Sequence, residues 1–293
     1  MTMNLGNHMM SHYELFKHLV TGDERLITLA GDDGRLHLGA AHSRRMEALQ
    51  ETVALAGAGG ARAHPVPTDV ADPAAATRMV EAAMERFGRV DVLINNAGVM
   101  PVGPFLEQSE QSIRSNIEVN VYGVLTGCQL ALPDMVKRRR GHVINIASLS
   151  GLIPLPGQVV YVGAKYAVVG LSTALADEMA PHGVDVSVIM PPFTNTDLIA
   201  GTKSGGAIKP VEPEDIAAAI IKTLNKPKTH VSVPPPLRFT AQAAQMLPPK
   251  GRRWMNKKLG LDDVFLEFDT AKRKAYEERA QAAQGVIDSD GKS

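Results

Sequence analysis

The feature that most constrains this chain is an alternation of short apolar runs with longer helical patterns, from about residue 34 to residue 233. In runs such as 90–94 and 184–190, most residues are apolar. A strand that is apolar on both faces is typical of a parallel sheet covered by helices on its two sides. The pattern therefore predicts an α/β fold with a Rossmann-like, doubly wound parallel sheet, whose ligands bind beyond the carboxyl ends of the strands.

The individual elements follow from apolar periodicity and from turn residues. We expect strands at 36–40, 63–66, 90–94, 143–147, 184–190 and 231–233, and helices at 44–56, 73–87, 111–138, 162–180 and 213–224. The helix over 73–87 should stop at Gly88, and the helix over 111–138 should bend near Pro133. Residues 25–34 are compatible with a first helix whose sequence pattern is degenerate.

The character of the chain changes after Val233, where three prolines interrupt the pattern. We therefore expect one Rossmann-like domain over residues 1–233, with residues 1–43 atypical, and a C-terminal helical extension over 234–293. The extension holds a basic stretch at 250–258 and an amphipathic helix pattern at 263–284. Its apolar stripe, which includes Val264, Phe265 and Phe268, favours packing on the core or on a subunit neighbour. A border of the substrate cleft and a membrane surface are the alternatives.

Composition gives little support for several classes of function. Lys plus Arg and Asp plus Glu both number 31, so net charge gives no reason to expect nucleic acid or an anionic membrane as the main partner. No apolar run reaches the roughly 20 residues that a membrane span needs. The single cysteine, Cys128, fits a reducing cytoplasm and is expected to be a small buried residue. The histidines lack metal-ligand spacing, and no metal is expected.

Tyr161 and Lys165 are the residues most suggestive of catalysis. They lie four positions apart on a predicted helix and so share one face. An ammonium group near a phenol lowers the phenol pKa from its usual value of about 10, which suits a general acid or base. Ser148 follows the strand at 143–147, where its hydroxyl can hold a substrate carbonyl. Asn120 could hold a water that relays protons.

Between about residues 34 and 233 the sequence resembles the short-chain dehydrogenase/reductase family. The resemblance rests on Asn95-Asn96-Ala97-Gly98 after a strand, Asn120, Ser148, Tyr161-x-x-x-Lys165, and Pro191 followed by Thr196. It implies that Tyr161 is the general acid/base, that Lys165 also binds the nicotinamide ribose, that Ser148 orients the substrate, and that Asn120 supports the proton relay. It also implies cofactor contacts from Asp69, Val70, Asn96, Ala97, Gly98, Tyr161, Lys165, Pro191, Thr194 and Thr196.

The pattern breaks at the phosphate-binding loop. The family opens with T-G-x-x-x-G-x-G between a strand and a helix, where backbone N–H groups hold the cofactor pyrophosphate. Here Thr21-Gly22 is followed by Asp23-Glu24-Arg25, and the later glycines are absent. Losing two charge-assisted hydrogen bonds would weaken binding by about 10²- to 10⁴-fold. Either the segment is genuine and the enzyme weak or inactive, or the first 40 or so residues were mis-assembled ahead of a normal gene.

The resemblance implies an NAD(P)-dependent oxidoreductase that transfers a hydride between a nicotinamide and a carbonyl or alcohol. NADP is favoured over NAD, because no acid follows the strand at 36–40 and Arg44 and Arg45 do. Apolar loops near 99–105, 149–160 and 196–208 suggest a hydrophobic substrate, and the family commonly forms dimers or tetramers. The alternatives are a catalytically weak or inactive binding or scaffold protein and, with less support, an epimerase or dehydratase on the same scaffold.

Overall fold

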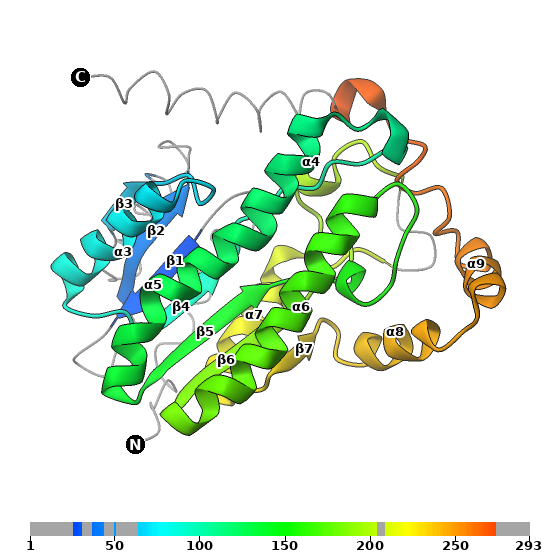
Figure 1. Ribbon diagram of the computed structural model, residues 1–293. Coiled ribbons are helices and arrows are strands. Elements are labelled where there is room, and N and C mark those ends of the chain that lie inside the picture. Colours follow the sequence, from blue (N-terminus) through cyan, green and yellow to red (C-terminus); the bar gives the residue numbers. More distant parts are fainter. Residues whose placement is uncertain (1–25, 31–36, 44–49, 51–63, 204–208, 274–293) are drawn as a thin grey trace.

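The computed structural model describes residues 26–30, 37–43, 50, 64–203 and 209–273. Their centre is a seven-stranded sheet in the order β3-β2-β1-β4-β5-β6-β7 (Figure 1). The strands are β1 Leu26–Ala30, β2 His37–Ser43, β3 His64–Pro67, β4 Val92–Asn95, β5 Gly141–Ile146, β6 Val184–Met190 and β7 His230–Ser232. The predicted Rossmann-like α/β fold is confirmed, and the predicted strands are found with shifts of a few residues at their ends.

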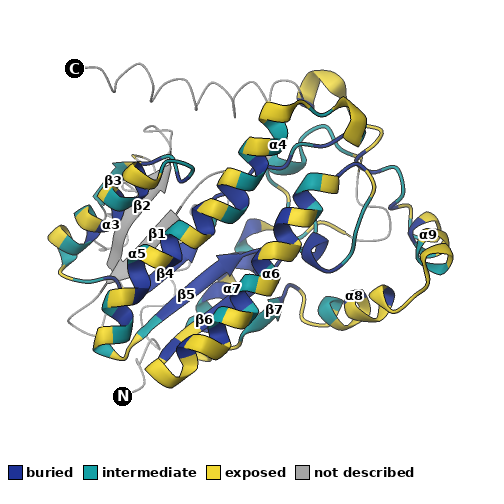
Figure 2. Cartoon of the chain, viewed as in Figure 1, coloured by how far each residue is buried: buried dark blue, intermediate teal, exposed yellow. Residues whose placement is uncertain are grey.

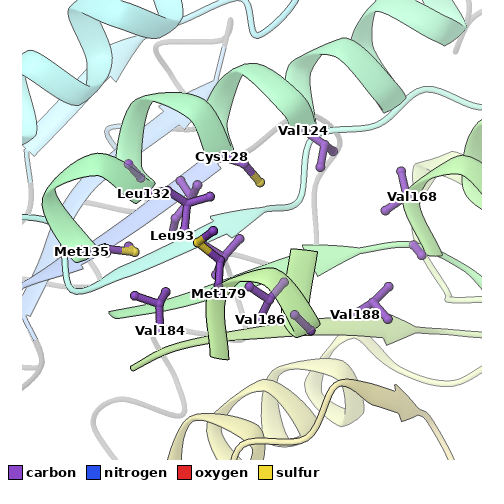
Figure 3. Packing of buried hydrophobic residues seen from close by; sticks show 14 of the residues in the cluster. Leu93, Val124, Cys128, Leu132, Met135, Val168, Met179, Val184, Val186 and Val188 are labelled. Atoms are coloured by element: carbon purple, nitrogen blue, oxygen red, sulfur yellow. The ribbon is translucent and has the colours of Figure 1, made fainter. Parts of the chain in front are cut away.

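Helices cover the sheet on both sides. They are α3 Pro73–Phe87, α4 Glu110–Ile117, α5 Gly123–Arg138, α6 Val159–Met179, α7 Pro213–Asn225, α8 Leu237–Gln245 and α9 Pro249–Lys258. Leu93 belongs to the apolar cluster under α3, α5 and α6 (Figure 3), whereas Val92 and Ile94 pack with Ile216 of α7. Because successive residues of a strand point to opposite faces, a strand covered on both faces is buried along its length and is therefore mainly apolar.

One strand runs against the others. Leu26 pairs with Asn95 and Leu29 with Val92, so β1 is antiparallel to β4, and it is antiparallel to β2 as well. All the other pairings are parallel. Only residues 31–36 separate β1 from β2, too few for the helical crossover of at least about ten residues that parallel neighbours require. The degenerate first helix predicted over 25–34 is therefore wrong for 26–30, whose backbone pairs with strands on both sides.

The helix ends follow local capping chemistry. The Asp72 side chain accepts the Ala74 N–H at 2.9 Å, and α3 ends at Gly88, which confirms the predicted helix over 73–87. The predicted helix over 111–138 consists of α4, a π-helical turn at Glu118–Tyr122, and α5. Helix α5 continues through the exposed Pro133, so the irregularity lies at the π-helical turn rather than near that proline.

The C-terminal extension differs from its prediction. A helix over 263–284 is wrong for 263–269, which form turns; the helix starts after Asp269, whose Oδ1 accepts the N–H groups of Ala271 and Lys272. An aspartate is a strong N-cap, so it defines a new start inside the apolar pattern. Residues 274–284, like most of the helix expected at 44–56, lie outside the described residues.

Helix α6 is central to the molecule and unusually apolar. By length and composition, Val159–His182 is long and apolar enough to cross a membrane, so the expectation that no apolar run reaches this length does not hold among the described residues. It lies against β6 and contributes Val168, Ala176 and Met179 to the main core. This is the helix on which the sequence places Tyr161 and Lys165.

Candidate active site

A cavity of about 130 Å³ opens at the carboxyl ends of β4, β5 and β6. It lies where these parallel strands end and their loops diverge, which is the expected ligand position in an open α/β sheet. The site residues predicted from the sequence that line it are Asn96, Gly98, Ser148, Tyr161, Lys165, Pro191, Thr194 and Thr196. Among the described residues that line the cavity, Lys165 is the only charged one.

Tyr161 and Lys165 are buried on one face of α6, as their spacing predicts. The Lys165 Nζ lies 5.5 Å from the centre of the Tyr161 ring and donates a hydrogen bond to the Ile146 carbonyl at 3.0 Å. Helix α6 is fixed to the sheet by a buried hydrogen bond from Asn145 Nδ2 to Ser172 Oγ at 2.9 Å. The two side chains are thus held by the core helix itself rather than by a loop.

Ser148 faces Tyr161 from the end of β5. Its extended backbone begins a short 3₁₀ turn, and its Oγ accepts the Ser150 N–H at 3.1 Å. The same hydroxyl lies 3.5 Å from the Pro191 carbonyl oxygen and hydrogen-bonds to Tyr161. The loop after β6 and the helix α6 therefore meet at one hydroxyl group.

Burial dominates the protonation of this pair. It raises the pKa of Tyr161 to about 12, opposed by the hydrogen bond with Ser148, and lowers the pKa of Lys165 to about 8. The expected lowering of the tyrosine pKa by the nearby ammonium is therefore wrong in direction. Desolvation disfavours both charged forms, the phenolate and the ammonium.

Asn120 lies behind the cavity, in the π-helical turn. It is fully buried, and its Nδ2 donates to the carbonyl oxygens of Val99 at 2.8 Å and Asn116 at 3.0 Å. Its Oδ1 has no hydrogen-bond partner among the described residues. A Cβ placed on Gly98 would lie 2.9 Å from that Oδ1 and 3.6 Å from Lys165 Nζ. Glycine thus keeps the space between Asn120 and Lys165 open, and π-helical turns are frequent at functional sites.

Three predicted cofactor contacts do not line the cavity. Val70 and Ala97 belong to a small apolar cluster with Val99 and Val119. Asp69 lies beside them, and its Oδ1 accepts the Ala71 N–H at 2.9 Å. All three sit near the carboxyl end of β3 or β4, at the edge from which an extended dinucleotide would approach.

Sequence reasoning found only part of the apolar wall of the cavity: Leu155 and Leu198 come from the expected apolar loops, whereas the aromatic part of the wall was missed. Phe193 stacks on Phe265, with ring centres 5.5 Å apart, and Leu261 adds to the same wall. Gly157 has a φ of 80°, and a Cβ there would lie 2.5 Å from the Phe265 carbonyl oxygen, so only glycine permits this approach. Of these residues only Phe265 carried a signal, because it lies on the apolar stripe of the extension.

The buried Gln158 was missed as well. It lines the cavity, its Oε1 accepts the Ser150 hydroxyl at 3.2 Å, and its Nε2 lies 2.9 Å from Met100 Sδ. No sequence pattern marks it, since a glutamine before a helix is common on protein surfaces.

Arg273 joins the extension to two loops of the cavity. It is 1% exposed, its Nη1 donates to the Leu198 carbonyl at 3.0 Å, and its Nη2 donates to the Met100 carbonyl. Lys203 forms ion pairs with Asp263 and Glu267 along the same seam. The loop after β4 and the loop after β6 are thereby held together by the extension.

The features of the cavity fit the nicotinamide end of a dinucleotide. The unpartnered Asn120 Oδ1 and the open space at Gly98 lie beside Lys165, and the polar groups of Asn96, Thr194 and Thr196 surround the same cavity. The predicted phosphate segment, Thr21–Arg25, lies outside the described residues, as do Arg44 and Arg45. Because Leu26 pairs with Asn95, β1 begins at the carboxyl edge of β4 and leads away from it.

Comparison with known proteins identifies the family to which a chain with this site belongs. The sequence model described as short chain dehydrogenase matches residues 19–205. An uncharacterized oxidoreductase of Staphylococcus saprophyticus is 35% identical over 218 residues, which cover 71% of this chain and 86% of the relative. Oxidoreductase UcpA of Salmonella typhimurium is 33% identical over 215 residues, covering 70% of this chain and 81% of that protein.

Solved structures agree. The acetoin dehydrogenase YohF from Salmonella typhimurium has 30% identity and a TM-score of 0.58, with 64% of this chain and 80% of that chain covered. A short-chain dehydrogenase/reductase from Burkholderia phymatum, solved in complex with NAD, has 26% identity and a TM-score of 0.63, with 75% and 85% covered. With the family motifs gathered at one cavity, this chain belongs to the short-chain dehydrogenase/reductase family.

Proposed function

We propose that this protein is an NAD(P)-dependent oxidoreductase that transfers a hydride between the nicotinamide and the carbonyl or alcohol carbon of an apolar compound. The observation that carries the proposal is the cluster of Tyr161, Ser148 and Lys165, which line one cavity, with Tyr161 and Lys165 buried and Ser148 partly buried. Relatives that carry the name oxidoreductase support the same class of reaction.

The bound cofactor would supply or accept the hydride, and the chain's own residues would manage the oxygen and the proton. The Ser148 hydroxyl would hold the substrate oxygen, and the Tyr161 phenol would donate a proton to it during reduction. A pKa raised to about 12 keeps this phenol protonated at neutral pH, which is the form that a general acid needs. Asn120, with its free Oδ1, would support proton exchange behind Lys165.

Residues around the cavity would also hold the cofactor. The nicotinamide half would be surrounded by Asn96, Gly98, Pro191, Thr194 and Thr196, which line the cavity. Ala97 would line the cofactor cleft beside them, and Asp69 and Val70 would approach the adenine end. Lys165 would bind the ribose hydroxyls. We favour NADP over NAD on the pair Arg44–Arg45, although one similar structure contains NAD.

The substrate wall supports an apolar compound. Leu155, Phe193, Leu198, Leu261 and Phe265 all line the cavity, and its polar groups cluster around Ser148 and Tyr161. Burying an apolar substrate against such a wall is favourable by about 25 cal/mol per Å² of apolar surface. A ketone or secondary alcohol with an apolar body places its one polar group where the polar side chains are.

The reversed strand β1 favours a second candidate function. A Rossmann phosphate site needs a parallel strand that leads into a helix N-terminus, and only residues 31–36 separate β1 from the antiparallel β2. A family member without that helix would bind the cofactor weakly or not at all. It would then act as a catalytically weak or inactive binding or scaffold protein.

One experiment separates the two candidates. The full-length protein is titrated with NADPH and with NADH while nicotinamide fluorescence is followed, and turnover is then measured with ketones of increasing length. Saturable binding with consumption of the reduced cofactor supports the oxidoreductase. No binding at millimolar cofactor supports the scaffold protein and rejects the enzyme.

We further propose that the protein forms a homo-oligomer, a dimer or a tetramer, in the cytoplasm. Large side chains remain exposed on the π-helical turn, α5 and α6, namely Tyr122, Leu125, Val159 and Tyr166. A Cβ on Gly163 or Gly170 would meet nothing within 4 Å, so a partner backbone could approach this face closely. Light scattering at micromolar concentration tests this, and a monomeric mass would reject it.

A further inference from the structure

A second surface, formed by α8 and α9, has no role in the proposed reaction. Helices α8 and α9 lie at one edge of the molecule and are largely exposed (Figure 2). We define the α8–α9 surface by four exposed apolar side chains and six bases. The apolar side chains are Phe239 (64% exposed), Met246 (86%), Leu247 (38%) and Trp254 (64%). The bases are Arg238, Lys250, Arg252, Arg253, Lys257 and Lys258.

Charge is strongly segregated in this part of the chain. Between Asp215 and Asp262 there is no acidic residue, although the whole chain has equal numbers of acids and bases. In the part of the chain that the structure describes, none of the six bases forms an ion pair. The zero net charge of the protein therefore conceals a basic surface, and a surface of this kind attracts anions by its local field.

The helices turn their apolar residues outward. On α8 the buried residues are Ala241 and Ala244, so Phe239 and Met246 fall on the opposite side of the helix. On α9 the buried residue is Asn256, two positions from Trp254, which again points away from the core.

A base accompanies each exposed ring of the surface. The Arg238 guanidinium lies 4.9 Å from the centre of the Phe239 ring, and Lys258 Nζ lies 6.0 Å from the centre of the Trp254 ring. An aromatic ring beside a cation suits the boundary between lipid and water, where the ring meets the acyl region and the charge meets the headgroups.

The combination of exposed apolar side chains and bases on one surface favours one kind of partner. A second copy seated symmetrically on the same surface would bring bases against bases. A nucleic acid would use the bases but gain nothing from a methionine and a leucine exposed to solvent. An anionic bilayer uses both, since its headgroups attract lysine and arginine and its boundary region accepts the apolar side chains. We propose that the α8–α9 surface docks this protein on membranes that contain anionic phospholipids.

Docking would place the substrate cavity close to the lipid. Helix α9 ends at Lys258, and Leu261, three residues later, lines the cavity together with Phe265. If the proposed function holds, an apolar substrate dissolved in the membrane would have a short path to Tyr161. The docking itself does not depend on the reaction and can be tested without turnover.

The test uses the full-length protein and two kinds of vesicle, phosphatidylcholine alone and equal parts phosphatidylcholine and phosphatidylserine. We expect sedimentation with the anionic vesicles only, and release at high salt. Trp254 is the only tryptophan in the chain, so its emission should shift to shorter wavelength when the anionic vesicles are added. Binding that is equal on both vesicles, or an unchanged Trp254 emission, would overturn the proposal.

Variants locate the surface. The triple reversal Lys250→Glu, Lys257→Glu, Lys258→Glu should weaken binding by at least about tenfold, and Trp254→Ala with Phe239→Ala should weaken it as well. The matched control, Lys137→Glu with Arg140→Glu, reverses exposed bases at the other end of the sheet and should change nothing. The proposal is overturned if the control variant loses vesicle binding to the same extent. It is also overturned if the protein binds nucleic acid but no vesicles, or if Phe239→Ala with Trp254→Ala yields a smaller oligomer.

Discussion

The Lys165 ammonium lies 5.5 Å from the centre of the Tyr161 ring, one helical turn along α6, and both side chains are buried. Burial disfavours both charged forms: it raises the pKa of Tyr161 to about 12 and lowers the pKa of Lys165 to about 8, so at neutral pH the phenol is protonated and the lysine still carries its charge. The pair is thus poised with a protonated phenol and a lysine whose charge is easily lost. This arrangement suits proton transfer to a substrate better than storage of a phenolate.

Tyr161→Phe should abolish turnover while leaving the fold intact. The change removes the only hydroxyl hydrogen-bonded to Ser148 from α6, and general acid–base catalysis typically contributes about 10²- to 10⁴-fold. Steady-state rates and thermal unfolding check this. The control is Tyr166→Phe on the same helix, whose hydroxyl donates to the Leu152 carbonyl outside the cavity. Activity of Tyr161→Phe within threefold of the unmodified protein would reject the mechanism.

Local patterns made the catalytic cluster predictable. Tyr161 and Lys165 share a face because four residues make about one helical turn, and Ser148 follows a mainly apolar, buried strand. Both statements depend on neighbours in sequence. The order of the motifs along the chain then indicated a single site, and the structure brings Ser148, Tyr161 and Lys165 to one cavity.

Long-range pairing was not predictable in the same way. The reversal of β1 depends on which backbones it meets, and residues 26–30 carry no periodicity that distinguishes a parallel from an antiparallel neighbour. Arg273 looked like one exposed base of an amphipathic helix, yet it is buried because the turns at 263–269 redirect the chain. The apolar wall of the cavity depends on the same redirection, because it brings together residues distant in sequence, such as Phe193 and Leu261, which are 68 positions apart.

NADPH should bind more tightly than NADH, and Arg44→Ala should remove the preference. Arg44 and Arg45 follow β2, where a basic residue can pair with the ribose phosphate that only NADP carries. Dissociation constants for both cofactors, with and without the substitution, check this. Both dissociation constants should be about 10²- to 10⁴-fold larger than those of a family member with an intact phosphate-binding loop. A preference for NADH that Arg44→Ala leaves unchanged would refute the assignment.

Stability should fall as the pH decreases from about 6.5 to about 4, through His142. Burial lowers the pKa of His142 to about 4 from its ordinary 6.5, and its Nε2 lies 2.8 Å from Ser187 Oγ. In that window the unfolded chain binds the proton and the folded chain does not, so the free energy of unfolding decreases as pH falls. The loss reaches up to about 3 kcal/mol.

Urea unfolding across this pH range measures the contribution of His142. The variant His142→Gln should lack this component of the slope, and His182→Gln, at an exposed position, should keep it. An identical slope in the unmodified protein and in His142→Gln would show that the buried imidazole is not responsible.

Arg273→Met should both destabilise the protein and loosen the substrate cavity. The substitution leaves the Met100 and Leu198 carbonyls without their donor, at a cost of about 2–4 kcal/mol. Because those carbonyls lie on two loops of the cavity, KM for an apolar ketone should rise more than kcat falls. Arg273→Lys should bring KM part of the way back to the value of the unmodified protein. Lys272→Met, at an exposed neighbour, should stay within about 0.5 kcal/mol of the unmodified protein.

Removing residues 260–293 should lower stability or solubility without changing membrane affinity. The deletion takes away Leu261, Val264 and Phe265, which are 2%, 1% and 1% exposed and pack with Tyr161. Their loss exposes the apolar wall of the cavity, and each large buried side chain contributes about 1.5–3 kcal/mol. Helices α8 and α9 remain, so the truncated protein should still sediment with anionic vesicles. If the full-length protein binds neutral vesicles and the truncated protein does not, the deleted segment is instead the membrane anchor. A Tm that the truncation leaves unchanged would contradict the structural role of this segment.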